Sequence, residues 1–401
     1  MNSRAAPPRG ARIRPIGIDL HMRTILSAAA TLTLLLGGAL GAPSACAEEY
    51  VIGIFTPRTG SAAKLGGTMR NGIALALEEA EDRGHFREGV HLSLKDYDDN
   101  AAPEVLAQRT EKLVRDNEIV LVIGPVFSTH AEVMAQYANR HAFPMLTPAV
   151  SAGVTDTGTW AFRSGVSPYR LIEDMTRGAL SRLQARKVAV VYPAGNAGFA
   201  SQAASVSRVV AQAGRLLVGQ VGIDTDEQSF TDTAAALRTV SPDVIFFCMD
   251  AEPAGVLASR LRRAGVVNAR LVFGPPAAQP ALLEVGRQSV ENALVVTDYL
   301  PELAGAQNKA FVAAYTQRFG KAPDRWAGLG YATGLIAAEA IRNAGPAPNR
   351  ASVRAALERG TSFTLPLGQS KWTMDLHHEP RYAPAFFTIR GGAFAPLPDS
   401  P

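Results

Sequence analysis

The feature that most constrains the fold is a regular alternation, from residue 50 onward, of short apolar runs with longer segments of helical periodicity. A short apolar run bounded by polar residues is typical of a buried strand, and the longer segments place apolar residues at helical spacing. Strands separated by helices of this length are joined by right-handed crossovers, which produce a parallel sheet. The sequence therefore predicts an α/β fold. The expected strands are 50–55, 91–97, 119–123, 144–147, 188–192, 216–221, 244–249 and 271–273, and the expected helices are 67–83, 103–116, 129–141, 169–183, 200–213, 231–239 and 253–264.

This rhythm starts twice. It restarts after Ser167, and the two successive α/β units have similar patterns. A helical region is expected over 301–344, with late strands at 372–374 and 385–390. The chain has 401 residues, of which 47% are hydrophobic, so it is long enough to bury two separate cores. We therefore expect two doubly wound lobes, not one long sheet.

The charge distribution argues against a nucleic-acid partner. The net charge is +4, from 40 basic and 36 acidic residues. Residues 1–47 hold five of the arginines and one aspartate, so the rest of the chain keeps 35 basic and 35 acidic residues. A neutral body lacks the basic surface that binding to a polyanion needs.

The N-terminal segment has the pattern of an export signal. Arg23 precedes an apolar stretch over 25–40, and small residues follow, ending in Ala-Cys-Ala at 45–47. This order predicts a secretory signal peptide cleaved after Ala47, and hence a periplasmic protein. The apolar stretch is short for a membrane span. Met22 is an alternative start, and we favour cleavage over lipidation at Cys46 because residues 43–45 lack the leucine usual at lipoprotein sites.

No pattern in the sequence indicates a metal or a cofactor. After cleavage only Cys248 remains, inside an apolar run, and we expect it to be a core residue. Residues 96–100 space their acids like a calcium loop, but Ala101 and Ala107 stand where such a loop needs Gly and Glu. The pair at 377–378 has no third ligand at metal spacing and is expected to form a surface turn.

The most informative segment, 119–151, reads as strand, loop, helix, strand and loop. Both loops lie at the carboxyl ends of parallel strands, where such sheets bind ligands. Gly124 lets the backbone approach closely, Ser128 and Thr129 lie at a helix N-terminus that attracts anions, and Ser151 adds a second hydroxyl. The segment therefore predicts a pocket for one carboxylate. In the alternative interpretation, Ser128 or Thr129 is only a helix cap and Ser151 only a turn residue.

The helix in this segment has its own start signal. Thr129 and Glu132 have the spacing of a capping box, which predicts a helix over 129–141. Ser128 and His130 are two residues apart, but the sequence shows no orienting acid or oxyanion loop for them, and it contains no nucleophile elbow or P-loop. An enzyme is therefore not expected.

The same loops carry a resemblance to a known family. In chain order, the matching residues are 52–56, Thr59-Gly60, Gly66, Asn71-Gly72, 97–99, Gly124-Pro125, Ser128, Pro144, Thr147-Pro148, Phe162-Arg163, 273–275, Phe319-Gly320, Tyr331-Ala332 and 391–394. In these positions the chain resembles the type I periplasmic binding proteins, specifically the branched-chain amino-acid (leucine-binding) family of ABC-transporter substrate-binding proteins. The resemblance spans about 50–400.

The resemblance implies two doubly wound parallel-sheet lobes joined by a three-segment hinge, with crossings placed near 167, 297 and 360. Lobe 1 then comprises 48–167 and 297–360, and lobe 2 comprises 168–296 and 361–401. A ligand lies between the lobes and is trapped by hinge closure.

The resemblance also implies ligand contacts. By motif position, Ser128 and Ser151 hold the ligand's α-carboxylate together with the backbone of Val150 or Ser151, and Phe127 lies beside them. The ammonium side departs from the family pattern, because the positions of the family's acids fall at prolines. Asp250, at a strand end, is the acid best placed to replace them, although a helix-capping role explains it equally well.

A buried ammonium without a partner is costly, so two ligand classes stay open. One is an amino acid, and the other is an aromatic or short organic acid without a free amine. We expect an exported, non-enzymatic, monomeric protein without cofactor that captures such a solute and presents it to an inner-membrane ABC permease. The alternative is an extracytoplasmic sensor of the same fold that feeds a signalling partner.

Overall fold

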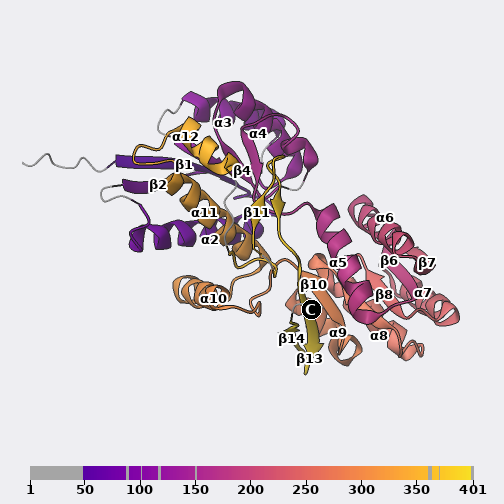
Figure 1. Cartoon of the computed structure of the whole chain (residues 1–401). Coiled ribbons are helices and arrows are strands. Elements are labelled where there is room, and N and C mark those ends of the chain that lie inside the picture. The colour runs from indigo at the N-terminus through magenta and orange to yellow at the C-terminus, as the bar shows by residue number, and fades with distance from the viewer. Residues whose placement is uncertain are drawn as a thin grey trace, which may run out of the picture. The chain divides into compact units, whose positions relative to one another are not determined.

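The computed structural model describes residues 48–86, 90–100, 102–115, 119–149, 151–359, 364–369 and 371–398. The expected signal segment, the expected boundary at 360 and the candidate ligand contact Val150 lie outside these residues. The described residues form an α/β structure with two large sheets and one two-stranded sheet (Figure 1).

The first sheet has the order β2-β1-β3-β4-β5 and is parallel throughout. Its strands are β1 (Glu48–Thr56), β2 (Val90–Asp98), β3 (Ile119–Ile123), β4 (Met145–Thr147) and β5 (Ala161–Arg163). Around it lie α2 (Ala63–Asp82), α3 (Pro103–Arg115), α4 (Ser128–His141), α11 (Arg325–Asn343) and α12 (Arg350–Glu358). Along β1 the side chains alternate, so that Ile52 and Ile54 join the core with α2 and α11, whereas Val51 and Phe55 join the core with α3 and α4.

The second sheet has the order β14-β13-β10-β9-β8-β6-β7. Its strands are β6 (Lys187–Pro193), β7 (Leu216–Ile223), β8 (Val244–Phe247), β9 (Arg270–Phe273), β10 (Leu294–Thr297), β13 (Ala385–Arg390) and β14 (Ala393–Pro396). β13 pairs antiparallel with both β10 and β14, and the other neighbouring strands pair parallel. Its helices are α5 (Pro168–Leu183), α6 (Ala197–Gln212), α7 (Glu227–Val240), α8 (Ala251–Arg263) and α9 (Pro280–Gly286).

Helices cover both faces of the second sheet, so it is doubly wound as expected. Side chains of α5 and α6 belong to one buried cluster, and those of α7, α8 and α9 to another. Cys248 follows β8 in the first of these clusters and is buried, which confirms the expected core position. Burial raises the pKa of its thiol to about 12, so the group is unreactive at neutral pH.

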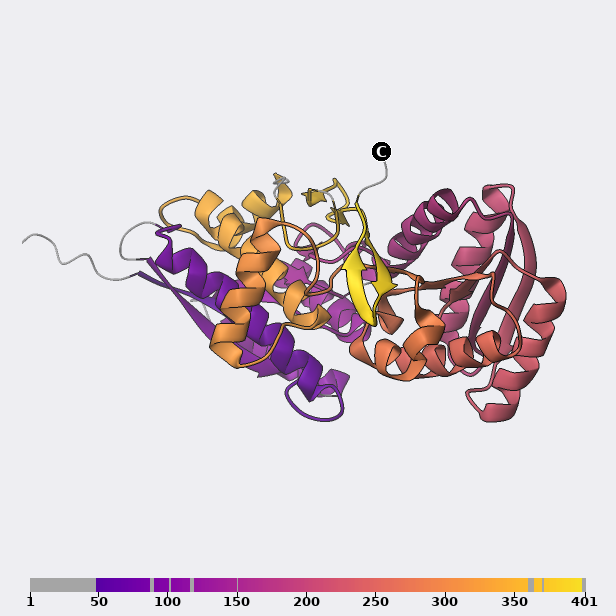
Figure 2. The same cartoon turned by 90° about the horizontal axis from the view of Figure 1, so that it is seen from below.

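The chain does not run through the two sheets in simple succession. After β10 it forms α10 (Ala306–Phe319) and then α11, which packs along α2 of the first sheet, before it ends in β13 and β14 (Figures 1 and 2). The close packing of α2 and α11 depends on glycine: a Cβ on Gly330 would overlap the Met69 carbonyl oxygen, and one on Gly72 would overlap that of Ala327.

A short hairpin of β11 (Thr373–Met374) and β12 (Pro380–Arg381) corrects one prediction. The expected surface turn buries His378, whose ring stacks on Phe162 with the centroids 4.1 Å apart. Its Nδ1 lies 3.1 Å from the Ala161 carbonyl oxygen. The predicted turn does form and His377 is exposed in it; the prediction is wrong only for His378, because the hairpin folds back onto β5, a contact between residues far apart in the chain. Burial lowers the pKa of His378.

A buried polar junction joins segments that come from both sheets. Asp298, just after β10, receives two hydrogen bonds from the Arg325 guanidinium at the start of α11, at 2.5 and 2.7 Å. The buried Tyr382 hydroxyl also hydrogen bonds the Asp298 carboxylate, and it accepts a 3.4 Å bond from the Val166 amide. Burial alone lowers the pKa of Arg325, but the attraction of Asp298 and its hydrogen bonds raise that pKa above its ordinary value.

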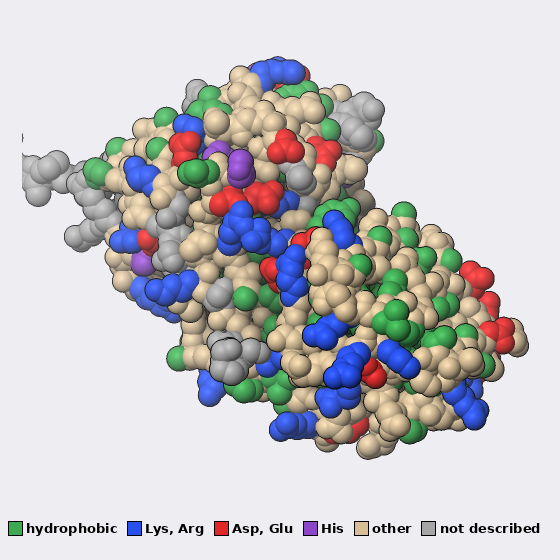
Figure 3. Space-filling model, turned by 45° about the vertical axis from the view of Figure 1, so that its right-hand side comes forward, with side chains coloured by type: hydrophobic (Ala, Val, Ile, Leu, Met, Phe, Trp, Pro, Cys, Tyr) green, Lys and Arg blue, Asp and Glu red, His purple; other side chains and the backbone are tan. Residues whose placement is uncertain are grey.

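On the side drawn in Figure 3, acidic and basic side chains both occur, in places directly beside one another. This distribution agrees with the charge balance of residues 48–401. In the part of the chain that the structure describes, no helix has the length and apolarity needed to cross a membrane.

Candidate functional site

The carboxyl ends of β1, β3 and β4 lie side by side in the first sheet, as predicted for the two loops of the informative segment. The β3 loop passes close to β1. Gly124 has φ +95, and a Cβ there would overlap the carbonyl oxygen of Phe55. Only glycine fits this position without strain, because it combines a left-handed φ with direct backbone contact.

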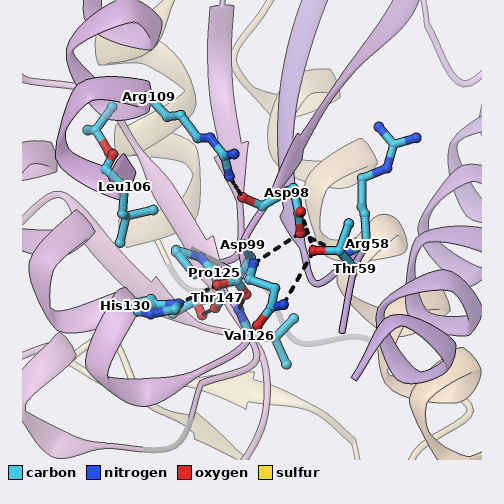
Figure 4. Close-up of polar contacts among 12 residues, drawn as sticks. Arg58, Thr59, Asp98, Asp99, Leu106, Arg109, Pro125, Val126, His130 and Thr147 are labelled. Carbon is cyan, nitrogen blue, oxygen red and sulfur yellow. Dashed lines mark hydrogen bonds and ion pairs between the residues drawn. The ribbon is translucent and has the colours of Figure 1, made fainter. Parts of the chain in front are cut away.

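A buried carboxylate holds the β3 loop in place (Figure 4). The Asp99 side chain is fully buried and accepts a hydrogen bond of 2.7 Å from the Val126 amide. Its other oxygen lies 2.7 Å from Nδ1 of His130 on α4. Burial raises the pKa of Asp99, and the bonds from His130 and the backbone act in the opposite direction. On the far side of the loop, the Thr147 hydroxyl donates to the Pro125 carbonyl at 2.5 Å.

The neighbouring carboxylate fixes the β1 loop. Asp98 accepts hydrogen bonds from the Arg58 amide at 2.8 Å, from the Thr59 hydroxyl at 2.7 Å and from the Asn100 amide at 3.0 Å. Of the acids in the calcium-like spacing, Asp98 thus accepts bonds from loop backbone, whereas Asp96 forms an ion pair with the Arg70 guanidinium at 3.1 Å. Among the described residues, no group of three or more His, Cys, Asp or Glu side chains is arranged to hold a metal ion.

Ser128 occupies the position that the sequence predicts, at the start of α4. It is the first helical residue and is half-buried, and Phe127 before it is extended, with φ −80 and ψ 134. The capping box predicted for Thr129 and Glu132 does not form, because the helix begins one residue earlier and has no side-chain cap at its N-cap residue. The Phe127 ring instead meets the His130 ring edge to face, at 5.9 Å.

Ser151 is near α4 as predicted, but its hydroxyl already has partners. Its Oγ donates a hydrogen bond to the Glu132 carboxylate and accepts one from the Gly153 amide at 3.2 Å. The sequence assigned Glu132 to the helix cap and gave no signal for this contact, which joins residues 19 positions apart. Ser151 is therefore bonded to an acidic side chain that stands four residues after Ser128 on α4.

Asp250 lies at the predicted strand end, after β8, in the second sheet. It is the N-cap residue of α8 and is exposed, with no side-chain capping bond. Although the side chain is exposed, partial burial raises the pKa of its carboxyl. The helix-capping role considered from the sequence therefore has no side-chain bond to support it, and the role of ammonium partner stays a prediction.

His130 and Asp99 are functional candidates that sequence reasoning missed. The sequence showed no acid to orient His130, yet the fold supplies one from 31 residues away. The two consecutive acids at the end of β2, Asp98 and Asp99, were a visible signal in the sequence. Asp99 reaches α4 only because β1 and β3 are neighbours in the sheet. Because both Asp99 oxygens have partners, the pair holds the loop and α4 together.

Comparison with known proteins identifies the family of this chain. A sequence model of the family described as periplasmic binding protein matches residues 49–393. The chain belongs to this periplasmic binding protein family.

Three relatives illustrate the similarity. The Leu/Ile/Val-binding protein BraC3 of Rhizobium johnstonii is 23% identical over 342 residues, which cover 84% of this chain and 91% of BraC3. A structure of a putative branched-chain amino acid ABC transporter from Rhodospirillum rubrum is 21% identical with a TM-score of 0.77, covering 87% of this chain and all of that one. A solute-binding protein from R. palustris in complex with benzoate is 19% identical with a TM-score of 0.67, covering 87% and 95%. These structures share the type I periplasmic binding protein fold.

Proposed function

We propose that this protein captures a small carboxylate-bearing solute between its two lobes and delivers it to an inner-membrane ABC permease. The observation that carries the proposal is the start of α4, where Ser128 is the first helical residue, directly after the loop at the carboxyl end of β3. The lobe boundaries are those expected from the sequence, 48–167 with 297–360 and 168–296 with 361–401. Export through a cleaved signal peptide and action as a monomer belong to the same proposal.

The names of the relatives support a carboxylate as the shared feature. One relative is named for leucine, isoleucine and valine, and a structural neighbour is bound to benzoate. These molecules differ in the amine and in the side chain, but all carry a carboxylate. Neutral donors suit this group, because free amides at a helix N-terminus and a hydroxyl attract an anion without a buried countercharge.

Delivery follows from differential binding to two states. A permease that contacts both lobes distinguishes the closed, loaded form from the open, empty form by its surface, and a ligand stabilises only the form to which it binds more tightly. We propose Ser128, Phe127 and the backbone around Val150 as the carboxylate contacts, with Ser151 and Asp250 as further contacts.

A thermal-shift screen tests the ligand class. The purified protein is melted with amino acids, aromatic acids, amides, dicarboxylates and neutral sugars. A ligand that binds only the folded state raises the melting temperature by mass action. We expect shifts with one or more carboxylates and none with sugars. Shifts produced by sugars alone would rule out the carboxylate proposal.

Replacing Ser128 by alanine tests the proposed contact. We expect the variant to bind the carboxylate ligand about 1–3 kcal/mol more weakly, because it loses a charge-assisted hydrogen bond. Isothermal titration calorimetry measures the change, with Ser229→Ala, a half-buried serine in the first turn of α7, as the control. Unchanged affinity in the Ser128 variant would remove this residue from the site.

A further inference from the structure

We propose that Glu132 makes this site select free α-amino acids over carboxylates that lack an amine. The inference rests on the proposed function, since it concerns the same site, and it adds the substrate class that the sequence left open. It also assigns to Glu132 and Ser151 the role of ammonium partner.

The first argument is the hydrogen-bonding capacity of Ser151. A serine hydroxyl has one donor and two acceptor positions. Here the donor is directed to the Glu132 carboxylate, and one acceptor position receives the Gly153 amide. What remains for a ligand is one acceptor position. Ser151 in this arrangement therefore meets a donor group of the ligand, not its carboxylate.

The second argument is the charge of Glu132. Its side chain lies against the turn η1 (Ala152–Val154), where a Cβ on Gly153 would come within 2.9 Å of its Oε1. In the described part of the chain, no basic side chain forms an ion pair with Glu132. An unneutralised carboxylate beside Ser151 repels a second carboxylate and attracts a cationic donor. Among the two open ligand classes, only the amino acid offers such a donor.

The third argument is the spacing along α4. Ser128 and Glu132 are four residues apart, and side chains at this spacing share one side of a helix, with their Cβ atoms about 5–6 Å apart. An α-amino acid carries its carboxylate and its ammonium on one carbon. Ser128 and the helix N-terminus can thus hold the first group while Glu132 and Ser151 hold the second. Glu132 of the first lobe thus takes the place of the ammonium-binding acid that the family pattern puts in the second lobe and that this chain lacks there.

Two variants separate these roles. Glu132→Gln keeps an oxygen that accepts the Ser151 hydroxyl but removes the charge. Ser151→Ala removes the hydroxyl and leaves the charge. Each is titrated calorimetrically with three matched pairs: leucine and 4-methylpentanoate, phenylalanine and 3-phenylpropanoate, and glutamate and glutarate. Benzoate is added as an acid without an amine. The readout is the ratio of dissociation constants between each deaminated acid and its amino acid.

We expect the unmodified protein to bind one of the amino acids at least tenfold more tightly than its deaminated partner. Glu132→Gln should reduce this ratio about tenfold, by weakening the amino acid and leaving the deaminated acid unchanged or improved. Ser151→Ala should also weaken only the amino acid, whereas Ser128→Ala should weaken both members of the pair equally. Glu111→Gln, an exposed glutamate on the neighbouring α3, serves as the matched control and should leave the ratio unchanged.

Other outcomes overturn the inference and leave the proposed function intact. These are tighter binding of benzoate or a deaminated acid than of any amino acid, or equal weakening of both members of a pair by Ser151→Ala. Binding of no carboxylate at all would reject the proposed function itself. If Glu132→Gln fails to fold, as shown by its melting curve, the Ser151→Ala titrations decide between the donor and acceptor roles.

Discussion

Replacing Asp298 by alanine is expected to lower the free energy of unfolding by about 3–5 kcal/mol. The change removes one partner of a buried ion pair, which costs this much because the other charge stays behind without compensation. Only 4% of the Asp298 side chain and 28% of the Arg325 side chain is exposed, so water replaces the lost bonds poorly. The Tyr382 hydroxyl loses its acceptor as well.

Urea unfolding followed by circular dichroism measures this loss. The control is Glu358→Ala, which breaks the ion pair with Arg354, where 45% of the glutamate side chain is exposed. An exposed pair of this kind contributes about 1 kcal/mol or less. A loss of that size in the Asp298 variant would show that the buried junction does not stabilise the fold. Asp298→Asn keeps the volume and one acceptor oxygen, so its loss should lie between the two.

Replacing Asp99 by alanine is expected to lower the free energy of unfolding by about 2–4 kcal/mol and to weaken ligand binding as well. The variant leaves the buried Val126 amide and the His130 ring without their acceptor, and an unsatisfied buried donor costs about 1–3 kcal/mol. The β3 loop then loses its attachment to β2, although Asp99 belongs to none of the proposed ligand contacts.

The two effects are measured separately, by urea unfolding and by titration with the ligand found in the thermal-shift screen. Asp99→Asn serves as a second variant. Its amide has only one acceptor oxygen, so it can accept the bond from Val126 while its NH₂ group, which cannot accept a bond, faces His130. Its stability should lie between those of the alanine variant and the unmodified protein. Full ligand affinity in a folded Asp99→Ala protein would show that this carboxylate does not position the loop.

The sheets and helices could be predicted because their signals are local. The apolar run at 119–123 became β3 over the same residues, and the run at 244–249 became β8 with Cys248 buried just after it. Each signal depends on spacing within a few residues, and hydrophobic burial then orients the element. The antiparallel pairing of β13 with β10 and β14 was not predicted, since direction depends on which strands become neighbours.

The candidate site was predicted in part for the same reason. Ser128 was placed correctly at a helix start because one strand, one loop and one helix follow each other directly. The hydrogen-bond partners of the polar groups were not predicted. Glu132 was expected to cap its own helix, and it instead accepts a hydrogen bond from the Ser151 hydroxyl. A carboxylate forms whichever hydrogen bond the packed backbone brings within reach, and that choice is made after the helix has formed.

By itself, the sequence determined the class of fold, the position of the loops at the strand ends and the family resemblance, because these depend on periodicity and on motif order along the chain. Only the tertiary structure decided which polar groups meet: Asp99 with His130, Asp298 with Arg325, and Ser151 with Glu132. The physical reason is that polar contacts act over a few ångströms, and residues far apart in the chain reach that distance only once the sheets and helices have packed.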